Sequence, residues 1–192
     1  MRHHILAASL ALTALPALPP TVLHAQDAEH RTRCTQAVEL FRKTDPQLDK
    51  FFQGSVGYAI FPSVGKGAFV VGGAAGTGCL YQGGEIIGEA KLAQVTVGLQ
   101  LGGQSYAEVI FFQNDHVIAA FKRNTFEMSA QVSAVAAASG VAATAKYRQG
   151  VLVFTVAKGG LMYEASVGGQ KFTFKPLAKD TVSTTGAEKP KD

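Results

Sequence analysis

Histidine and cysteine are scarce in this chain, and their scarcity limits its chemistry. Five of the 192 residues are histidine and two are cysteine. A zinc site needs three or four cysteine, histidine or acidic ligands at suitable spacing, whereas His30, His116, Cys34 and Cys79 are scattered along the sequence after position 26. No nucleophile is paired with a base either. We therefore expect no catalytic residues, no metal site and no cofactor, and a protein that is not an enzyme.

Charged residues are also few. They make up 17% of the chain against 47% hydrophobic residues, which predicts a folded domain with a full core and not a disordered protein. The formal net charge of +4 is mildly basic and too weak by itself to indicate nucleic-acid binding.

A hydrophobic run long enough to span a membrane is missing from the N-terminal region. The apolar stretch Ile5–Leu15 follows Arg2 and is broken by Pro16, whereas a spanning helix needs about 20 continuous apolar residues. A charged start followed by a short apolar core is typical of a signal peptide. We expect residues 1–25 to be cleaved after Ala25, and the protein to be periplasmic or secreted.

Export makes a bond between the two cysteines chemically accessible. An oxidising compartment permits a disulfide between Cys34 and Cys79. Two separate buried thiols are the alternative, since the sequence does not show whether the α-carbons come within about 7 Å. The sequence leaves this pairing open.

Helical periodicity is confined mainly to residues 26–53. In Asp27–Lys43, apolar residues recur at i, i+3, i+4 and i+7, which predicts an amphipathic helix. Asp45 followed by Pro46 predicts the cap and first turn of a second short helix. The expected inward face of the first helix consists of Cys34, Ala37, Val38 and Phe41, with Leu40 beside them.

From Gly54 the pattern changes to alternation and short apolar runs. Residues 54–175 therefore predict a mainly β (α+β) domain, a single antiparallel β-sandwich or barrel-like domain. One short internal helix should begin at Asn114 or Asp115, and residues 176–192 should be a disordered tail. The expected strands include 95–104, 105–113 and 126–138, and those at 151–157, 161–167 and 171–175 should form a terminal antiparallel meander.

The segment Ser63–Gly78, "SVGKGAFVVGGAAGTG", does not match a nucleotide-binding loop. Such a loop needs GxxxxGK followed by Ser or Thr, but Gly67 follows Lys66, and Ile60 stands where the leading glycine belongs. Glycines inside strands mark bulges, bends or close backbone approaches. We interpret these glycines as packing elements.

Glu108 is the one carboxylate that we expect on a largely apolar strand face. It shares that face with Tyr106, Ile110 and Phe112. A buried carboxylate can serve as an acid, although such residues are more often exposed or paired.

Five blocks of this sequence follow one another in a specific order with specific glycine positions. They are "GYAIFPSVGKGAFVVGGAAGTG", "VGLQLGGQSYAEVIFF", "AAFKR", "FEMSAQVSAVAAASG" and "VLVFTVAKGGLMYEASVGG". With these blocks the chain resembles the SYLF domain family over roughly residues 45–169. The resemblance implies a mainly antiparallel β domain with N-terminal helices and no known catalytic activity. The family is described as a lipid-binding module that also occurs in yeast actin-bundling proteins, and eukaryotic members are reported to bind phosphoinositides.

The resemblance also implies candidate lipid-binding residues. Basic side chains near the first helix would contact anionic headgroups, and apolar ones would contact acyl chains. A lipid or an anionic membrane surface is therefore the expected partner, and no nucleic acid is expected. The alternative is a structural or assembly protein of the cell envelope that binds another protein. The headgroup candidates are Arg31, Arg33, Arg42, Lys43 and Lys66, and the acyl-chain candidates are Leu40 and Phe41.

Overall fold

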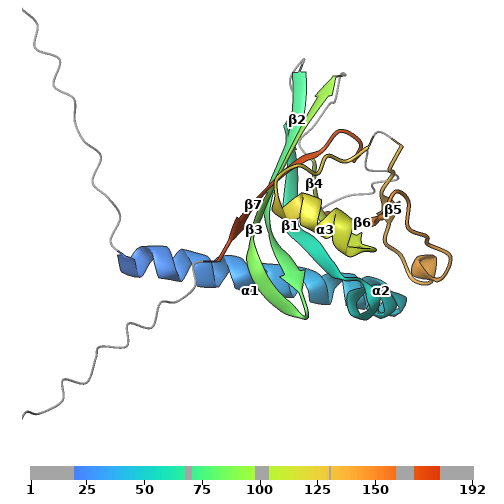
Figure 1. Cartoon of the computed structure of the whole chain (residues 1–192), viewed down its shortest axis with the longest axis horizontal. Helices are drawn as coiled ribbons and strands as arrows, with labels where there is room; N and C mark the ends of the chain where they lie inside the picture. Colours follow the sequence, from blue (N-terminus) through green and yellow to red (C-terminus); the bar gives the residue numbers. More distant parts are fainter. Residues whose placement is uncertain (1–19, 68–70, 98–103, 130, 159–166, 178–192) are drawn as a thin grey trace, which may run out of the picture.

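One seven-stranded sheet organises the chain in a computed structural model, which describes residues 20–67, 71–97, 104–129, 131–158 and 167–177 (Figure 1). The helices are α1 (Pro20–Thr44), η1 (Pro46–Leu48), α2 (Asp49–Gly54), α3 (Asp115–Lys122) and η2 (Val141–Ala143). The strands are β1 (Gly57–Gly67), β2 (Val71–Gln82), β3 (Glu85–Val97), β4 (Gln104–Phe112), β5 (Val135–Ala136), β6 (Val151–Lys158) and β7 (Lys171–Pro176).

The prediction of a mainly β domain is confirmed, but the predicted antiparallel sandwich or barrel-like arrangement is wrong. The strands form a single open sheet in the order β5-β6-β4-β1-β2-β3-β7. The sheet is mixed, because β5 runs parallel to β6 while the other described pairs are antiparallel. Alternation along a strand predicts which residues face a core, but it does not predict whether a second sheet or a helix covers that face.

Each face of the sheet has its own apolar cluster, as β4 shows. Val109 and Phe111 point toward the cluster that includes α1 and α2, whereas Ile110 and Phe112 point toward the cluster that includes α3. All four side chains are fully buried. The strand β4 is therefore covered on both faces.

The N-terminal helices largely follow the sequence pattern. In Figure 1, α1 runs across the lower part of the sheet, and its first turns extend past the strands. The carboxylate of Asp45 accepts a hydrogen bond from the amide of Gln47, and Pro46 opens η1. The four residues expected to face inward from α1, Cys34, Ala37, Val38 and Phe41, are all buried.

The internal helix begins as predicted. The side chain of Asn114 accepts a hydrogen bond from the amide of Val117 at 3.1 Å and caps α3. Ile118 and Phe121 are buried on its inner face. Lys122 lies in the last turn, where a cation is favourable next to the helix carboxyl end.

The predicted strand at residues 126–138 is wrong. Among the residues of this segment that the structure describes, only Val135–Ala136 pair as a strand, although Met128, Val132 and Ala134 are buried as the alternation required. These three side chains belong to the apolar cluster on the α3 face of the sheet, while the segment takes little part in the hydrogen-bonded ladder. Alternation of apolar residues indicates which side chains are buried. It does not show whether the backbone of the segment pairs with a neighbouring strand.

The predicted terminal meander is also wrong in the part that the structure describes. β6 pairs with β4 and β5, whereas β7 pairs with β3 at the opposite edge of the sheet. Of the expected strand at 161–167 only Val167 is described, and the expected strand at 95–104 falls mostly on residues 98–103. Those six residues, the C-terminal tail from 178 and the first 19 residues lie outside the described residues.

The glycines of β2 pack against a bulge in β1. The register between β1 and β2 shifts between Ile60 and Ser63. A methyl group at Gly78 would overlap the carbonyl oxygen of Ile60, and one at Gly76 would lie 2.9 Å from the carbonyl oxygen of Ser63. The packing role predicted for these glycines is confirmed at both positions.

Candidate functional site

A disulfide fastens α1 to the sheet. The structure joins Cys34 of α1 to Cys79 of β2, with 6.1 Å between their α-carbons and a sequence separation of 45. Both side chains are buried. Cys34 faces the sheet together with Ala37 and Val38, because residues spaced i, i+3 and i+4 lie on one face of a helix. Of the two alternatives that the sequence left open, the structure contains the bonded pair.

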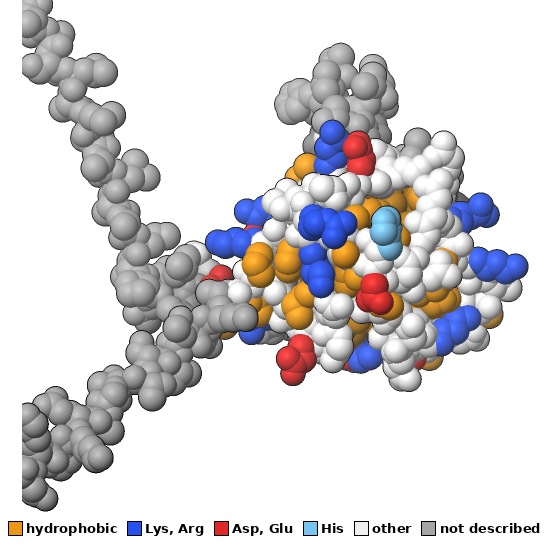
Figure 2. All heavy atoms as spheres, in the orientation of Figure 1, with side chains coloured by type: hydrophobic (Ala, Val, Ile, Leu, Met, Phe, Trp, Pro, Cys, Tyr) orange, Lys and Arg blue, Asp and Glu red, His pale blue; other side chains and the backbone are white. Residues whose placement is uncertain are grey.

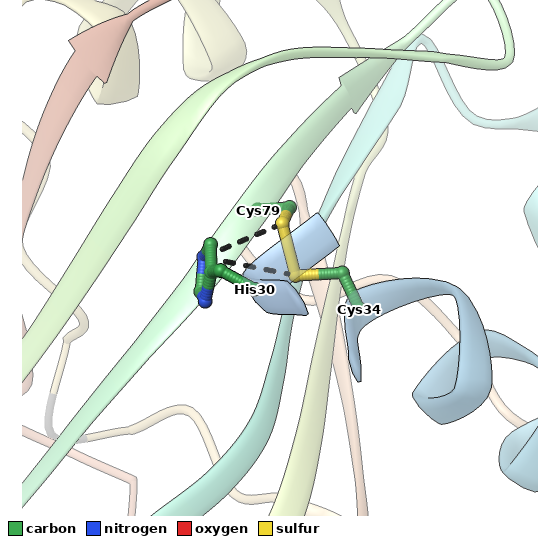
Figure 3. Close-up of side chains that lie close together, drawn as sticks. All are labelled: His30, Cys34 and Cys79. Atoms are coloured by element: carbon green, nitrogen blue, oxygen red, sulfur yellow. Dashed lines mark hydrogen bonds between the residues drawn. A yellow bond between two sulfur atoms is a disulfide. The ribbon is translucent and has the colours of Figure 1, made fainter. Parts of the chain in front are cut away.

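His30 lies against this disulfide (Figure 3). Its Nε2 atom is 3.5 Å from the Cys79 sulfur and 3.9 Å from the Cys34 sulfur. The same nitrogen donates a hydrogen bond to the carbonyl oxygen of Gly78 at 3.1 Å, since a carbonyl can only accept. The ring is half-buried. One imidazole and two sulfur atoms therefore converge within 4.8 Å of one another.

The interpretation of these three residues as scattered is wrong, because the structure brings them together. His30 and Cys34 are four positions apart on the predicted helix, which places them on one helix face. That spacing was a usable signal. The approach of Cys79 was not predictable, since it depends on how β2 crosses α1.

The Arg33 groove, between α1 and strands β1, β2 and β6, contains two predicted lipid-binding residues. It has a volume of about 430 Å³ and is lined among others by Arg33, Lys158, Ser63, Thr77, Leu40 and Pro62. Two cations stand in its lining and no acidic residue does. Arg33 pairs with Glu29 at 2.8 Å on the outer surface. An exposed pair of this kind contributes little and is easily exchanged.

The Arg31 groove, on the other side of α1, has a balanced lining. Its volume is about 270 Å³, and its charged residues are Arg31 and Lys175 against Asp27 and Glu89. His30 and Cys79 also line this groove, so that the sulfur and imidazole cluster is reached from it. It therefore has no net charge with which to attract an anion.

The Arg42 groove, beside α2, is the largest of the three at about 590 Å³. Arg42 binds Asp49 at 2.8 Å and Glu39 at 3.3 Å, and its guanidinium lies 5.1 Å from the centre of the Phe52 ring. Tyr58 is stacked on Tyr81 deeper in the groove. Burial is the main cause that raises the pKa of Tyr58, so its hydroxyl stays protonated. Two carboxylates already neutralise the arginine here.

The other predicted lipid-binding residues differ in accessibility. Lys43 is exposed and Leu40 is half-buried, whereas Phe41 is fully buried against the sheet. While α1 is packed, Phe41 therefore contacts the core and cannot reach an acyl chain. Lys66 belongs to β1, but its side chain lies outside the described residues.

Glu108 lies in a buried polar cluster on the α3 side of the sheet. Its Oε2 atom accepts a hydrogen bond from Nε2 of Gln170 at 3.1 Å, and it also interacts with the Tyr106 hydroxyl. Burial first and the Glu108 charge second raise the pKa of Tyr106. Glu108 is thus a paired core carboxylate, with partners that hold it in place. His116, by contrast, is exposed on α3.

Basic side chains are distributed over the visible surface without forming one continuous patch. In Figure 2 they alternate with acidic and apolar side chains over the face that is drawn. Among the helices that the structure describes, none combines the length and the apolar composition needed to cross a membrane.

Comparison with known proteins agrees with the resemblance seen in the sequence. Residues 93–180 match the family described as "Ysc84: Las17-binding protein actin regulator". A curated relative, "Beta cell expansion factor A" from Aeromonas veronii, is 26% identical over 170 residues, which cover 87% of this chain and 62% of that protein. The chain thus spans less than two thirds of that relative. Residues 93–180 are thus similar to the SYLF family, in agreement with the resemblance of the sequence blocks.

Proposed function

We propose that this protein is an exported, non-enzymatic SYLF-family protein that binds anionic lipid headgroups at a membrane surface. The observation that carries the proposal is the composition of the Arg33 groove. Its lining has two cations and no carboxylate, whereas the linings of the Arg31 and Arg42 grooves both contain acidic residues. The signal sequence expected at residues 1–25 supplies the export.

The Arg33 groove has the chemistry that a phosphate-bearing headgroup requires. Arg33 and Lys158 supply positive charge, and the hydroxyls of Ser63 and Thr77 supply hydrogen-bond donors. Leu40 and Pro62 provide an apolar border on which the first acyl carbons can rest. Arg31 and Lys43 are exposed on the same helix and add to the attraction without lining this groove.

Co-sedimentation with vesicles tests this proposal. Each basic residue near an anionic surface contributes about 1 kcal/mol. We expect the double variant Arg33→Ala/Lys158→Ala to lose about 2 kcal/mol of membrane affinity, roughly 30-fold, at low salt. Binding of the unaltered chain should weaken as salt is raised.

A matched control removes the same charge elsewhere. Lys146 and Arg148 are both exposed and line none of the three grooves. The variant Lys146→Ala/Arg148→Ala should bind nearly as the unaltered chain does. An equal loss of membrane affinity in both double variants would show that only the net charge matters, and would refute the groove as the binding site.

If the unaltered chain stays in the supernatant with anionic and with neutral vesicles, membrane binding is refuted. The alternative from the sequence, an envelope assembly protein that binds another protein, would then be pursued by crosslinking in intact cells. The name of the matched family concerns actin regulation. We do not transfer that role, because an exported protein would not meet cytoplasmic actin.

A further inference from the structure

We propose that His30, Cys34 and Cys79 form a redox-gated zinc site. In the oxidised chain the two cysteines are bonded to each other. After reduction by a dithiol, the two thiolates and the imidazole would bind one Zn²⁺ ion, with water in the fourth position. This inference does not rest on the proposed lipid binding.

The geometry around His30 is close to that of a tetrahedral zinc site. Zinc–sulfur bonds of about 2.3 Å and a zinc–nitrogen bond of about 2.0 Å place a nitrogen ligand roughly 3.6 Å from each sulfur. The Nε2 atom of His30 lies 3.5 Å from the Cys79 sulfur and 3.9 Å from the Cys34 sulfur. The nitrogen already lies at about ligand distance from both sulfurs. Zinc binding requires the two sulfurs to separate to about 3.8 Å. It also requires the ring to turn, because the side of Nε2 that would face the ion now points at the Gly78 carbonyl oxygen.

The local structure supplies what a zinc site needs besides its ligands. His30 and Cys34 are fixed four residues apart on one face of α1, and Cys79 approaches from β2. Two thiolates and one imidazole suit zinc better than magnesium or calcium. Because His30 and Cys79 both line the Arg31 groove, an ion and its water ligand have access from the surface.

The chemical steps balance without any further reactant. A dithiol gives two electrons and two protons to the Cys34–Cys79 bond and becomes a disulfide itself. Zinc then displaces one proton from each thiol. Nε2 of His30 now donates to Gly78, so zinc binding also requires the tautomer that carries its proton on Nδ1. The half-buried ring can exchange that proton with water.

Metal titration of the full chain, oxidised and phosphine-reduced, tests the site. Zn²⁺ is added in competition with a coloured chelator, and Co²⁺ is used separately as a spectroscopic probe. We expect the reduced chain to bind one equivalent, with tetrahedral thiolate–cobalt bands, and the oxidised chain to show none. His30→Ala should weaken zinc binding at least about tenfold, and Cys34→Ser or Cys79→Ser should abolish the cobalt bands.

His116→Ala is the matched control, because it removes an exposed imidazole on α3 and should leave zinc binding unchanged. The histidines at positions 3, 4 and 24 are present in every variant and cancel in the comparison. Equal affinity of His30→Ala and His116→Ala would overturn the proposal. So would a reduced chain that binds no more zinc than the oxidised chain, which would make the disulfide purely structural.

Near-UV circular dichroism covers the case in which reduction unfolds the chain. The proposed site would then couple zinc binding to folding. Recovery of the native spectrum on adding Zn²⁺, lost in His30→Ala, would support it. A reduced chain that stays unfolded with zinc would refute it.

Discussion

The carboxylate of Asp45 accepts a hydrogen bond from the backbone amide of Ala142 at 2.8 Å, across 97 positions of sequence. Its other oxygen accepts from the amide of Gln47 at 3.1 Å and caps η1. One side chain thus starts a helix next to α1 and holds the segment that contains η2 against it. Asp45 is buried, so a lost partner there is not replaced by water.

We expect Asp45→Ala to lower the free energy of unfolding by about 2 to 4 kcal/mol, from the lost cap and the buried amide left without a partner. Asp45→Asn keeps an acceptor oxygen and should cost less. Urea denaturation of both variants measures this. A loss in Asp45→Ala no greater than in Asp45→Asn would contradict the double role.

The same carboxylate predicts a pH dependence of stability. Burial opposes ionisation of Asp45, but hydrogen bonds from the amides of Ala142, Gln47 and Gly140 outweigh it and lower the pKa below the ordinary 3.8. A native pKa below the unfolded value means that the contribution is fully present above pH 3.8 and is lost as pH falls through the native pKa. Unfolding midpoints compared between wild type and Asp45→Asn should converge in acid.

The disulfide predicts a large effect of serine substitution. A bond that closes a loop of 45 residues removes about 4 kcal/mol worth of unfolded-chain entropy. We expect Cys34→Ser/Cys79→Ser to lose on the order of that amount in urea denaturation of the oxidised protein. Phosphine reduction in the absence of metal should destabilise wild type similarly and leave the double variant unchanged. A double variant as stable as oxidised wild type would contradict the bond's role.

Local sequence rules predicted those parts of the fold that depend on neighbouring residues. The caps at Asp45 and Asn114 could be predicted because a cap needs only one side chain and the next turn of backbone. The buried face of α1 could be predicted for the same reason, since it depends only on nearby residues. The single sheet could not be predicted, because each of its strands has apolar residues that could equally face a second sheet.

The site was less predictable than the fold. Arg33 and Lys158 line one groove although 125 positions separate them in the sequence, and nothing near either residue indicates the other. From the sequence, Arg31, Arg33 and Arg42 were predicted to be equivalent headgroup-binding cations. The positions of the neighbouring acidic side chains distinguish Arg42 from Arg33. Asp49 and Glu39 both pair with Arg42, whereas Arg33 pairs with Glu29 on the outer surface and the lining of its groove contains no carboxylate.

Gly78 should be intolerant of even a methyl group. A β-carbon there would overlap the Ile60 carbonyl oxygen and lie 2.8 Å from Cδ1 of Phe61, whereas nothing lies within 4 Å of one added at Gly65. We expect Gly78→Ala to cost about 1 to 3 kcal/mol or more by overpacking, and Gly65→Ala to be nearly neutral. Thermal unfolding of the two variants provides the comparison. Equal midpoints would show that the β1 bulge can move aside.

The buried pair of Glu108 and Gln170 predicts non-additive energetics. Gln170→Leu removes the amide that donates to the Glu108 carboxylate at 3.1 Å, in a place where neither side chain is exposed. We expect it to cost about 1 to 3 kcal/mol, because a buried acceptor loses a donor. Adding Glu108→Leu removes that acceptor as well, so the double variant should cost at least about 1 kcal/mol less than the sum of the singles. Denaturation of all four proteins gives this coupling energy. Additive losses would show that the hydrogen bond between Glu108 and Gln170 contributes no coupling energy, and would contradict this prediction.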